Sequence, residues 1–241
     1  MTKMTKRDAL RHGLAVLSLL VGIVTGPAVA APVDAKAGLL AVIARYQPGT
    51  PPDAAIIAAV DAAAKRLEAT QPVPDLLRNT ALVDGMWTTL FSSQGIVGEI
   101  DVAFMTRSMP GGGAPGGKAR VHNILQELRI ADRFYRNMMM IDAGPAQTPI
   151  FYSATADVSV TADHPNDLAV RFTRFVFAPA RADVSNDDVR QALALPAGAP
   201  LALEIPADKL PPASASTVSF VDGDIRINRG KDYIAVLRRV Q

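Results

Sequence analysis

Cysteine and histidine, two residue types often used in metal binding and catalysis, are scarce in this chain. It has no cysteine, which excludes disulfides, thiolate metal sites and a cysteine nucleophile. Of its three histidines, His12 lies near the N-terminus, His122 is expected at a strand edge, and His164 opens a His-Pro-Asn-Asp stretch that favours a turn. Neither of the latter two has a histidine four residues away or a neighbouring pair of carboxylates, so we predict no metal site and no cofactor.

The serines, glycines and aspartates that could support catalysis have simpler structural interpretations. No Gly-x-Ser-x-Gly nucleophile motif occurs. Gly112–Ala119 fits the phosphate-binding pattern G-x-x-x-x-G-K but lacks the Ser or Thr that binds magnesium, which favours a surface loop. Asp222 and Asp224 are separated by one residue in an expected hairpin turn, where an aspartate side chain stabilises the turn by local hydrogen bonds. A Ser–His–Asp triad built on His122 or His164 stays open as an alternative.

Residues 1–30 are predicted to be a secretory signal peptide. A basic stretch, Lys3–Arg11, precedes the apolar run Leu14–Val24, which at eleven residues is too short to span a bilayer. Ala28-Val29-Ala30 matches the small-residue cleavage pattern. Thr5–Arg11 also resembles a twin-arginine leader, with lysine at the first arginine position. We therefore expect an exported protein, most simply in a bacterial periplasm, by either route.

The basic isoelectric point belongs to this leader. The 241-residue chain has 25 Lys+Arg and 23 Asp+Glu, a net charge of +2 and an isoelectric point near 9.0. Removal of residues 1–30 would leave 21 basic and 22 acidic residues, a net charge of −1. No basic stripe interleaved with aromatic residues remains, so nucleic acid is not an expected partner. Association with a membrane surface and the oligomeric state stay open.

The rest of the chain divides into a helical and a strand-rich part. Residues 34–74 are alanine-rich and predict two helices, about Ala35–Arg45 and a second one that starts with Thr50 as its N-cap. Residues 75–241 predict one domain of many strands joined by turn residues, which is typical of an antiparallel sandwich or barrel. A short helix is expected at Asn186–Leu193.

Two motifs stand at the two ends of the strand-rich part. Val218–Leu237 contains an acidic turn at Asp222, then Ile-Arg-Ile-Asn-Arg-Gly ending at Gly230, then an apolar strand. Leu82–Ser93 contains Gly85-Met86-Trp87 followed by an apolar, Thr- and Ser-containing run. Both motifs resemble the PAP/fibrillin family of plastid lipid-associated proteins, which typically has Ser where this chain has Asn in the first motif. The resemblance spans about residues 36–239, and its middle matches mainly in pattern.

The resemblance implies a lipocalin-like antiparallel β-barrel preceded by helices. Gly85 would permit close backbone approach where the first strand enters the barrel, and Trp87 would close one end. An arginine from the last strands would stack over the indole, with Arg226 and Arg229 as the candidates. The simplest interpretation is that these residues, with Asp222 and Gly230, stabilise the barrel.

The fold predicted is therefore all-β, a mainly antiparallel lipocalin-like barrel with an N-terminal helical segment. The resemblance implies non-enzymatic binding or carriage of a small apolar molecule, such as a lipid, isoprenoid or quinone, in the barrel lumen. Two alternatives remain: a structural or interaction barrel with a packed interior, and a hydrolase or isomerase on the same barrel. The lumen candidates are Phe104, Phe134, Met139, Phe151, Phe172 and Phe175.

Overall fold

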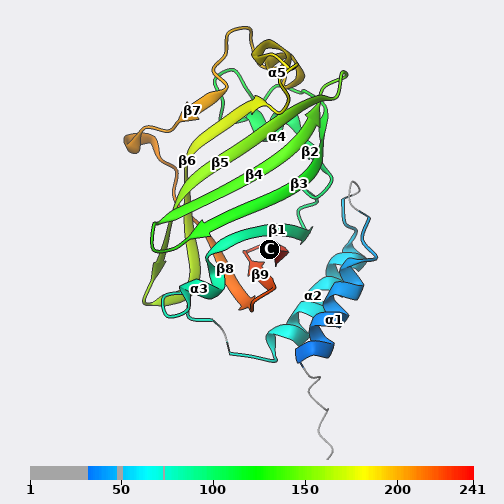
Figure 1. The fold of residues 1–241 in the computed structure, drawn as a ribbon, viewed down its shortest axis with the longest axis vertical. Coiled ribbons are helices and arrows are strands. Elements are labelled where there is room, and N and C mark those ends of the chain that lie inside the picture. Colours follow the sequence, from blue (N-terminus) through cyan, green and yellow to red (C-terminus); the bar gives the residue numbers. More distant parts are fainter. Residues whose placement is uncertain (1–31, 48–50, 73) are drawn as a thin grey trace, which may run out of the picture.

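The computed structural model describes residues 32–47, 51–72 and 74–241 (Figure 1). The predicted signal peptide and Thr50, the expected N-cap of the second helix, lie outside the described residues. None of the described helices is long and apolar enough to cross a membrane. The helices are α1 Pro32–Ile43, α2 Ala54–Glu68, α3 Thr80–Val83, α4 Val102–Thr106 and α5 Asn186–Ala192, and a 3-10 turn spans Ala207–Lys209. The strands are β1 Gly85–Ser92, β2 Glu99–Asp101, β3 Lys118–Arg129, β4 Phe134–Ala143, β5 Thr148–Thr161, β6 His164–Pro179, β7 Ala202–Glu204, β8 Ser214–Val221, β9 Ile225–Arg229 and β10 Ile234–Arg239.

An antiparallel sheet closes on itself to form the barrel. Its strands follow the order β1-β10-β9-β8-β6-β5-β4-β3, and β3 pairs in turn with β1, so eight strands of the described chain form a closed ring. Closure pairs the two edges that an open sheet would expose. β2 adds to β3 and β7 adds to β6 outside the ring. The predicted antiparallel barrel with N-terminal helices is therefore confirmed.

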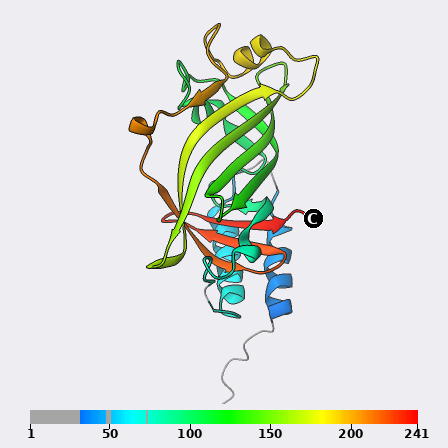
Figure 2. The same cartoon turned by 60° about the vertical axis from the view of Figure 1, so that its left-hand side comes forward.

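The barrel wall is higher on one side than on the other. Strands β3 to β6 have 10 to 16 residues, whereas β1, β8, β9 and β10 have 5 to 8. Figure 2 shows the long strands rising past the C-terminal strands toward α5. The upper inner surface of the long strands therefore has no strand opposite it and needs another cover.

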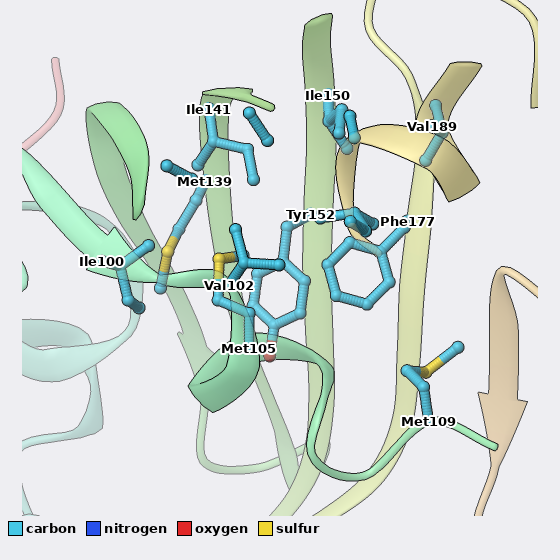
Figure 3. Packing of buried hydrophobic residues seen from close by; sticks show 14 of the residues in the cluster. Ile100, Val102, Met105, Met109, Met139, Ile141, Ile150, Tyr152, Phe177 and Val189 are labelled. Atoms are coloured by element: carbon cyan, nitrogen blue, oxygen red, sulfur yellow. The ribbon is translucent and has the colours of Figure 1, made fainter. Parts of the chain in front are cut away.

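Helix α4 and the segment after it supply that cover. Val102, Met105 and Met109 are buried and belong to one apolar cluster with Ile141 of β4 and Tyr152 of β5 (Figure 3). Helix α5 lies at the same end and adds to the cluster (Figure 1). The sequence predicts no helix at α4, because five residues are too few for a helical periodicity to show.

Helices α1 and α2 pack on the outside of the short strands (Figure 1). The buried positions of α2 include Val60, Ala64 and Leu67, which recur at helical spacing on one face. Asp53, not Thr50, is the N-cap, because its Oδ1 accepts the amide of Ile56 at 2.8 Å. The Pro51-Pro52 pair favours an extended chain before the helix, which moves the start of α2 to Ala54.

The opposite end of the barrel is closed by apolar packing around Trp87. The indole is fully buried, and its Nε1 donates to the carbonyl of Val83 at 2.8 Å. Leu76, Leu128 and Leu237 are fully buried in the same cluster. This end of the barrel is therefore filled by side chains.

Two turns differ from the sequence prediction. His164 pairs with Thr161 and begins β6, so the turn consists of Ala162 and Asp163 instead of the His-Pro-Asn-Asp stretch. Pro165 is accommodated in the strand although it lacks an N–H, and its carbonyl accepts the amide of Leu76 at 2.8 Å. In the β8–β9 hairpin the amide of Asp222 donates to the carbonyl of Ile225, so the loop begins after Asp222, where the turn itself is expected.

Candidate ligand cavity

A cavity of about 280 Å³ lies inside the barrel between the closed end and α4. Its apolar lining includes Ile124, Met139, Leu168, Val170, Phe172 and Ala235. Its polar lining includes Gln126, Tyr135, Asn137, Ser216, Asn228 and Tyr233. The lumen thus combines an apolar wall with a polar patch contributed by β3, β4, β8 and β9.

A second cavity of about 250 Å³ adjoins the first below α4. Both are lined by Asn137, Met139 and Phe172. The second cavity is completed by Tyr152 and by Phe175. A third hollow of about 440 Å³ is lined by β2, the segment before it and Phe104 of α4. Ligand pockets in proteins usually measure about 300–1,000 Å³, so the two inner cavities together reach that range.

Strand alternation decides which side chains line these cavities. Along β4, Tyr135, Asn137 and Met139 line the first cavity. The residues between them point outward, because successive side chains of a strand lie on opposite faces. Of the three consecutive methionines only Met139 lines a described cavity, as the alternation argument requires.

Four of the six predicted lumen residues line a cavity. Met139 and Phe172 line both inner cavities, and Phe175 lines the second. Phe104 lies on α4 at the edge of the second cavity; it is 53% exposed, and the guanidinium of Arg107 lies 3.7 Å from its ring centroid.

The lumen assignments of Phe134 and Phe151 are wrong. Each is one residue away from a lumen-lining tyrosine on its strand, Tyr135 and Tyr152, and therefore faces outward. The Arg129 guanidinium lies 4.4 Å from the ring centroid of Phe134 on that outer face. Both residues are aromatic and lie in strands, so residue type alone does not tell whether they face the lumen or the outside. The position of each residue in the alternating strand decides it.

The polar patch continues below the first cavity to a buried arginine, Arg226. Its side chain is fully buried, its Nη2 donates to Oε1 of Gln126, and its guanidinium lies 4.9 Å from the Trp87 ring centroid. Its Nε and Nη1 have no hydrogen-bond partner among the described residues. Burial lowers the pKa of Arg226 to about 10, so the group is still a cation at neutral pH.

A second arginine, Arg239, stacks on the same indole at 4.3 Å and was not among the predicted candidates. Its Nη1 donates to the carbonyl of Asp84 at 2.7 Å. The backbone of Gly85 has φ +128°, and a Cβ there would lie 2.7 Å from that Nη1. Gly85 therefore provides both a backbone conformation and a space that a larger residue would remove.

Arg229, the other predicted stacking residue, points away from the lumen. Its guanidinium pairs with Glu68 and Asp61 of α2, each at 2.7 Å. It therefore holds a helix against the barrel. The reason lies in strand alternation, because Arg226 and Asn228 face inward along β9 and Arg229, one residue further, faces outward.

Asp222 and Gly230, the remaining motif residues, stabilise the ends of β8 to β10. Although burial acts to raise the pKa of Asp222, hydrogen bonds from the Ile225 amide, Lys36 and the Asp224 amide hold it below its ordinary value. A Cβ on Gly230 would lie 2.0 Å from Cε1 of Tyr233, so no side chain fits.

The structure also places the residues considered for catalysis. His122 Nε2 lies 2.7 Å from Oδ2 of Asp142. In the described part of the chain no serine forms a hydrogen bond with the imidazole of His122 or of His164. His164 is exposed. The described residues include no group of three or more His, Asp or Glu that could hold a metal ion.

The family model PAP_fibrillin matches residues 33–238. The chain belongs to this family. The match covers the N-terminal helices and the whole barrel, so it spans both motifs that resemble the PAP/fibrillin proteins. In this PAP_fibrillin member, Trp87 closes one end of the barrel and the cavity lies beyond it. Both observations are consistent with binding of an apolar molecule.

A solved structure resembles this PAP_fibrillin chain more distantly. It is a lipocalin-like protein from Bacteroides uniformis with 8% sequence identity and a TM-score of 0.27, and the similarity covers 65% of this chain and 97% of that one. Similarity at this level supports no functional statement. No curated protein sequence matches the chain.

Proposed function

We propose that this protein binds or carries a small, largely apolar molecule in the barrel lumen. The observation that carries the proposal is the pair of adjoining cavities of about 280 and 250 Å³ inside a closed barrel. Packed protein interiors have few voids larger than a water molecule. A lumen of this size, lined by Leu168, Val170 and Phe172, suits an occupant better than it suits a purely structural barrel.

Burial of the ligand would provide the driving force. Removal of apolar surface from water contributes about 25 cal/mol per Å². The lining offers aromatic, aliphatic and methionine side chains, and Met139 can adapt to ligands of different shape. Lipids, isoprenoids and quinones all fit this description.

Probe binding to the mature chain tests the proposal. We expect saturable uptake of methyl cis-parinarate, a neutral fluorescent polyene, with one site per chain. The variant Ala235→Phe places a large side chain in the first cavity and should weaken uptake at least tenfold. The control Ala169→Phe lies on β6 between the lumen residues Leu168 and Val170, so it faces outward and should bind normally. Absence of saturable uptake by the folded protein would refute the proposal.

Export is part of the proposal and is tested separately. The leader pattern of residues 1–30 supports it. We expect full-length protein expressed in a Gram-negative host to appear in the periplasmic fraction with an intact mass that begins at Ala31. Full-length mass with cytoplasmic retention would contradict it.

A further inference from the structure

The buried cation below the cavity suggests the chemical class of the ligand. Arg226 is fully buried and still charged at neutral pH, yet no carboxylate among the described residues pairs with it. Arg239, which is also positive, acts electrostatically on Arg226 and lowers its pKa. An unpaired buried charge is costly, and a structure usually retains it only where something compensates it.

The surroundings of Arg226 connect it to the cavity. Gln126, which accepts its Nη2, lines the first cavity. Asn228, two residues further along β9 and on the same face, lines it too. Tyr135 and Tyr233, which lie close enough to Arg226 to influence its pKa, are also lining residues. The cation therefore lies directly behind the polar patch.

The polar patch also has donors for a ligand. Gln126 uses Oε1 toward Arg226, which leaves its Nε2 for a ligand oxygen. Burial raises the pKa of Tyr135 to about 12, so its hydroxyl remains a donor at neutral pH. Leu168, Val170 and Phe172 of β6 give the same cavity an apolar wall. The cavity thus has a polar, electropositive end and an apolar body.

We propose that the ligand is an amphipathic carboxylate, with its anionic head at Gln126, in front of Arg226, and its apolar chain along β4 and β6 toward α4. This inference rests on the proposed function and specifies it. A carboxylate would accept charge-assisted hydrogen bonds from the patch and neutralise the buried guanidinium. A neutral ester or alcohol of the same shape would fill the apolar part but leave Arg226 uncompensated.

The experiment compares cis-parinaric acid with its methyl ester on the mature chain at pH 7.5. The two probes share one apolar body and differ in head charge. We expect the acid to bind at least tenfold more tightly than the ester. In Gln126→Leu and Arg226→Met the ratio should fall toward one, mainly through loss of acid affinity. Arg238→Gln, which removes a half-exposed arginine outside the lumen, should keep the wild-type ratio.

Each outcome separates this inference from the proposed function. Equal binding of acid and ester would overturn the carboxylate assignment and leave the apolar lumen standing. Failure of both probes to bind would overturn both. Should Arg226→Met fail to fold, the wild-type ratio and Gln126→Leu decide the matter, because Gln126 lines the cavity.

Discussion

Arg229 and Glu68 form a bidentate ion pair that joins the end of β9 to helix α2. Nε of Arg229 donates to Oε1 of Glu68 at 2.7 Å, and its Nη2 donates to Oε2 at 3.0 Å. Oε1 also accepts the hydroxyl of Ser219 on β8. The pair is about three-quarters buried, so it contributes more than a surface ion pair would.

Arg229→Ala should destabilise the protein by about 1–3 kcal/mol, because it leaves the Glu68 carboxylate partly buried without its main partner. Chemical denaturation measures the change. Arg238→Ala is the matched control, since its contact with Asp224 is longer at 3.6 Å and half-exposed, and it should have little effect. Equal effects of the two variants would show that the pair does not hold the helix.

Trp87→Ala should lower stability by about 3–5 kcal/mol or prevent folding, because it empties the fully buried end of the barrel. It also removes the ring that Arg226 and Arg239 contact at 4.9 and 4.3 Å. Thermal melting followed by circular dichroism is the measurement. A well-folded variant with an unchanged melting temperature would count against the indole as the plug of this end.

Gly85→Ala should cost about 1–3 kcal/mol, because alanine is strained at φ +128° and its methyl group would displace the Arg239 guanidinium. Gly38→Ala provides the contrast. It lies in α1 with nothing within 4 Å of a Cβ, so it should be neutral or stabilising. Similar melting temperatures for the two variants would contradict the role given to Gly85.

Acid should weaken the attachment of α1 to the β8–β9 hairpin. The pKa of Asp222 lies below its ordinary 3.8 in the folded protein, so its contribution is present above that value and is lost as pH falls through the folded pKa. We expect Asp222→Asn to be less stable than wild type at pH 6. The difference should shrink below about pH 4 in urea titrations across pH. A difference that is independent of pH would exclude the Lys36–Asp222 contact as its source.

Local patterns were enough to predict much of this fold. Helix α2 and the strands around Asp222 follow from short-range periodicity and turn residues, whereas the Gly85-Met86-Trp87 entry follows from the family resemblance. Short-range patterns do not predict which side chains of β4 to β6 face inward. Register shifts at Thr155 and Ser159 displace the alternation relative to the neighbouring strand, and they depend on pairing across the barrel.

The candidate site depended even more on tertiary contacts. Met139 and Phe172 could be proposed from residue type alone, whereas the buried position of Arg226 required the face of β9. Arg239 was missed because a C-terminal arginine next to Arg238 is usually solvated. Only the space left by Gly85 and the pairing of Trp87 with Arg239 bring it to the ring.

Because the barrel wall is higher on one side, the size of the second cavity and the strand pairing of the barrel depend on different segments of the chain. The ceiling of the second cavity is α4, five residues that pair with no strand of the closed ring. Substitutions at Phe104 or Met105 can therefore change the size of the second cavity without breaking the hydrogen bonds between strands. Relatives that share this ring could differ in the shape of the second cavity through this one short helix while they keep the same strand pairing.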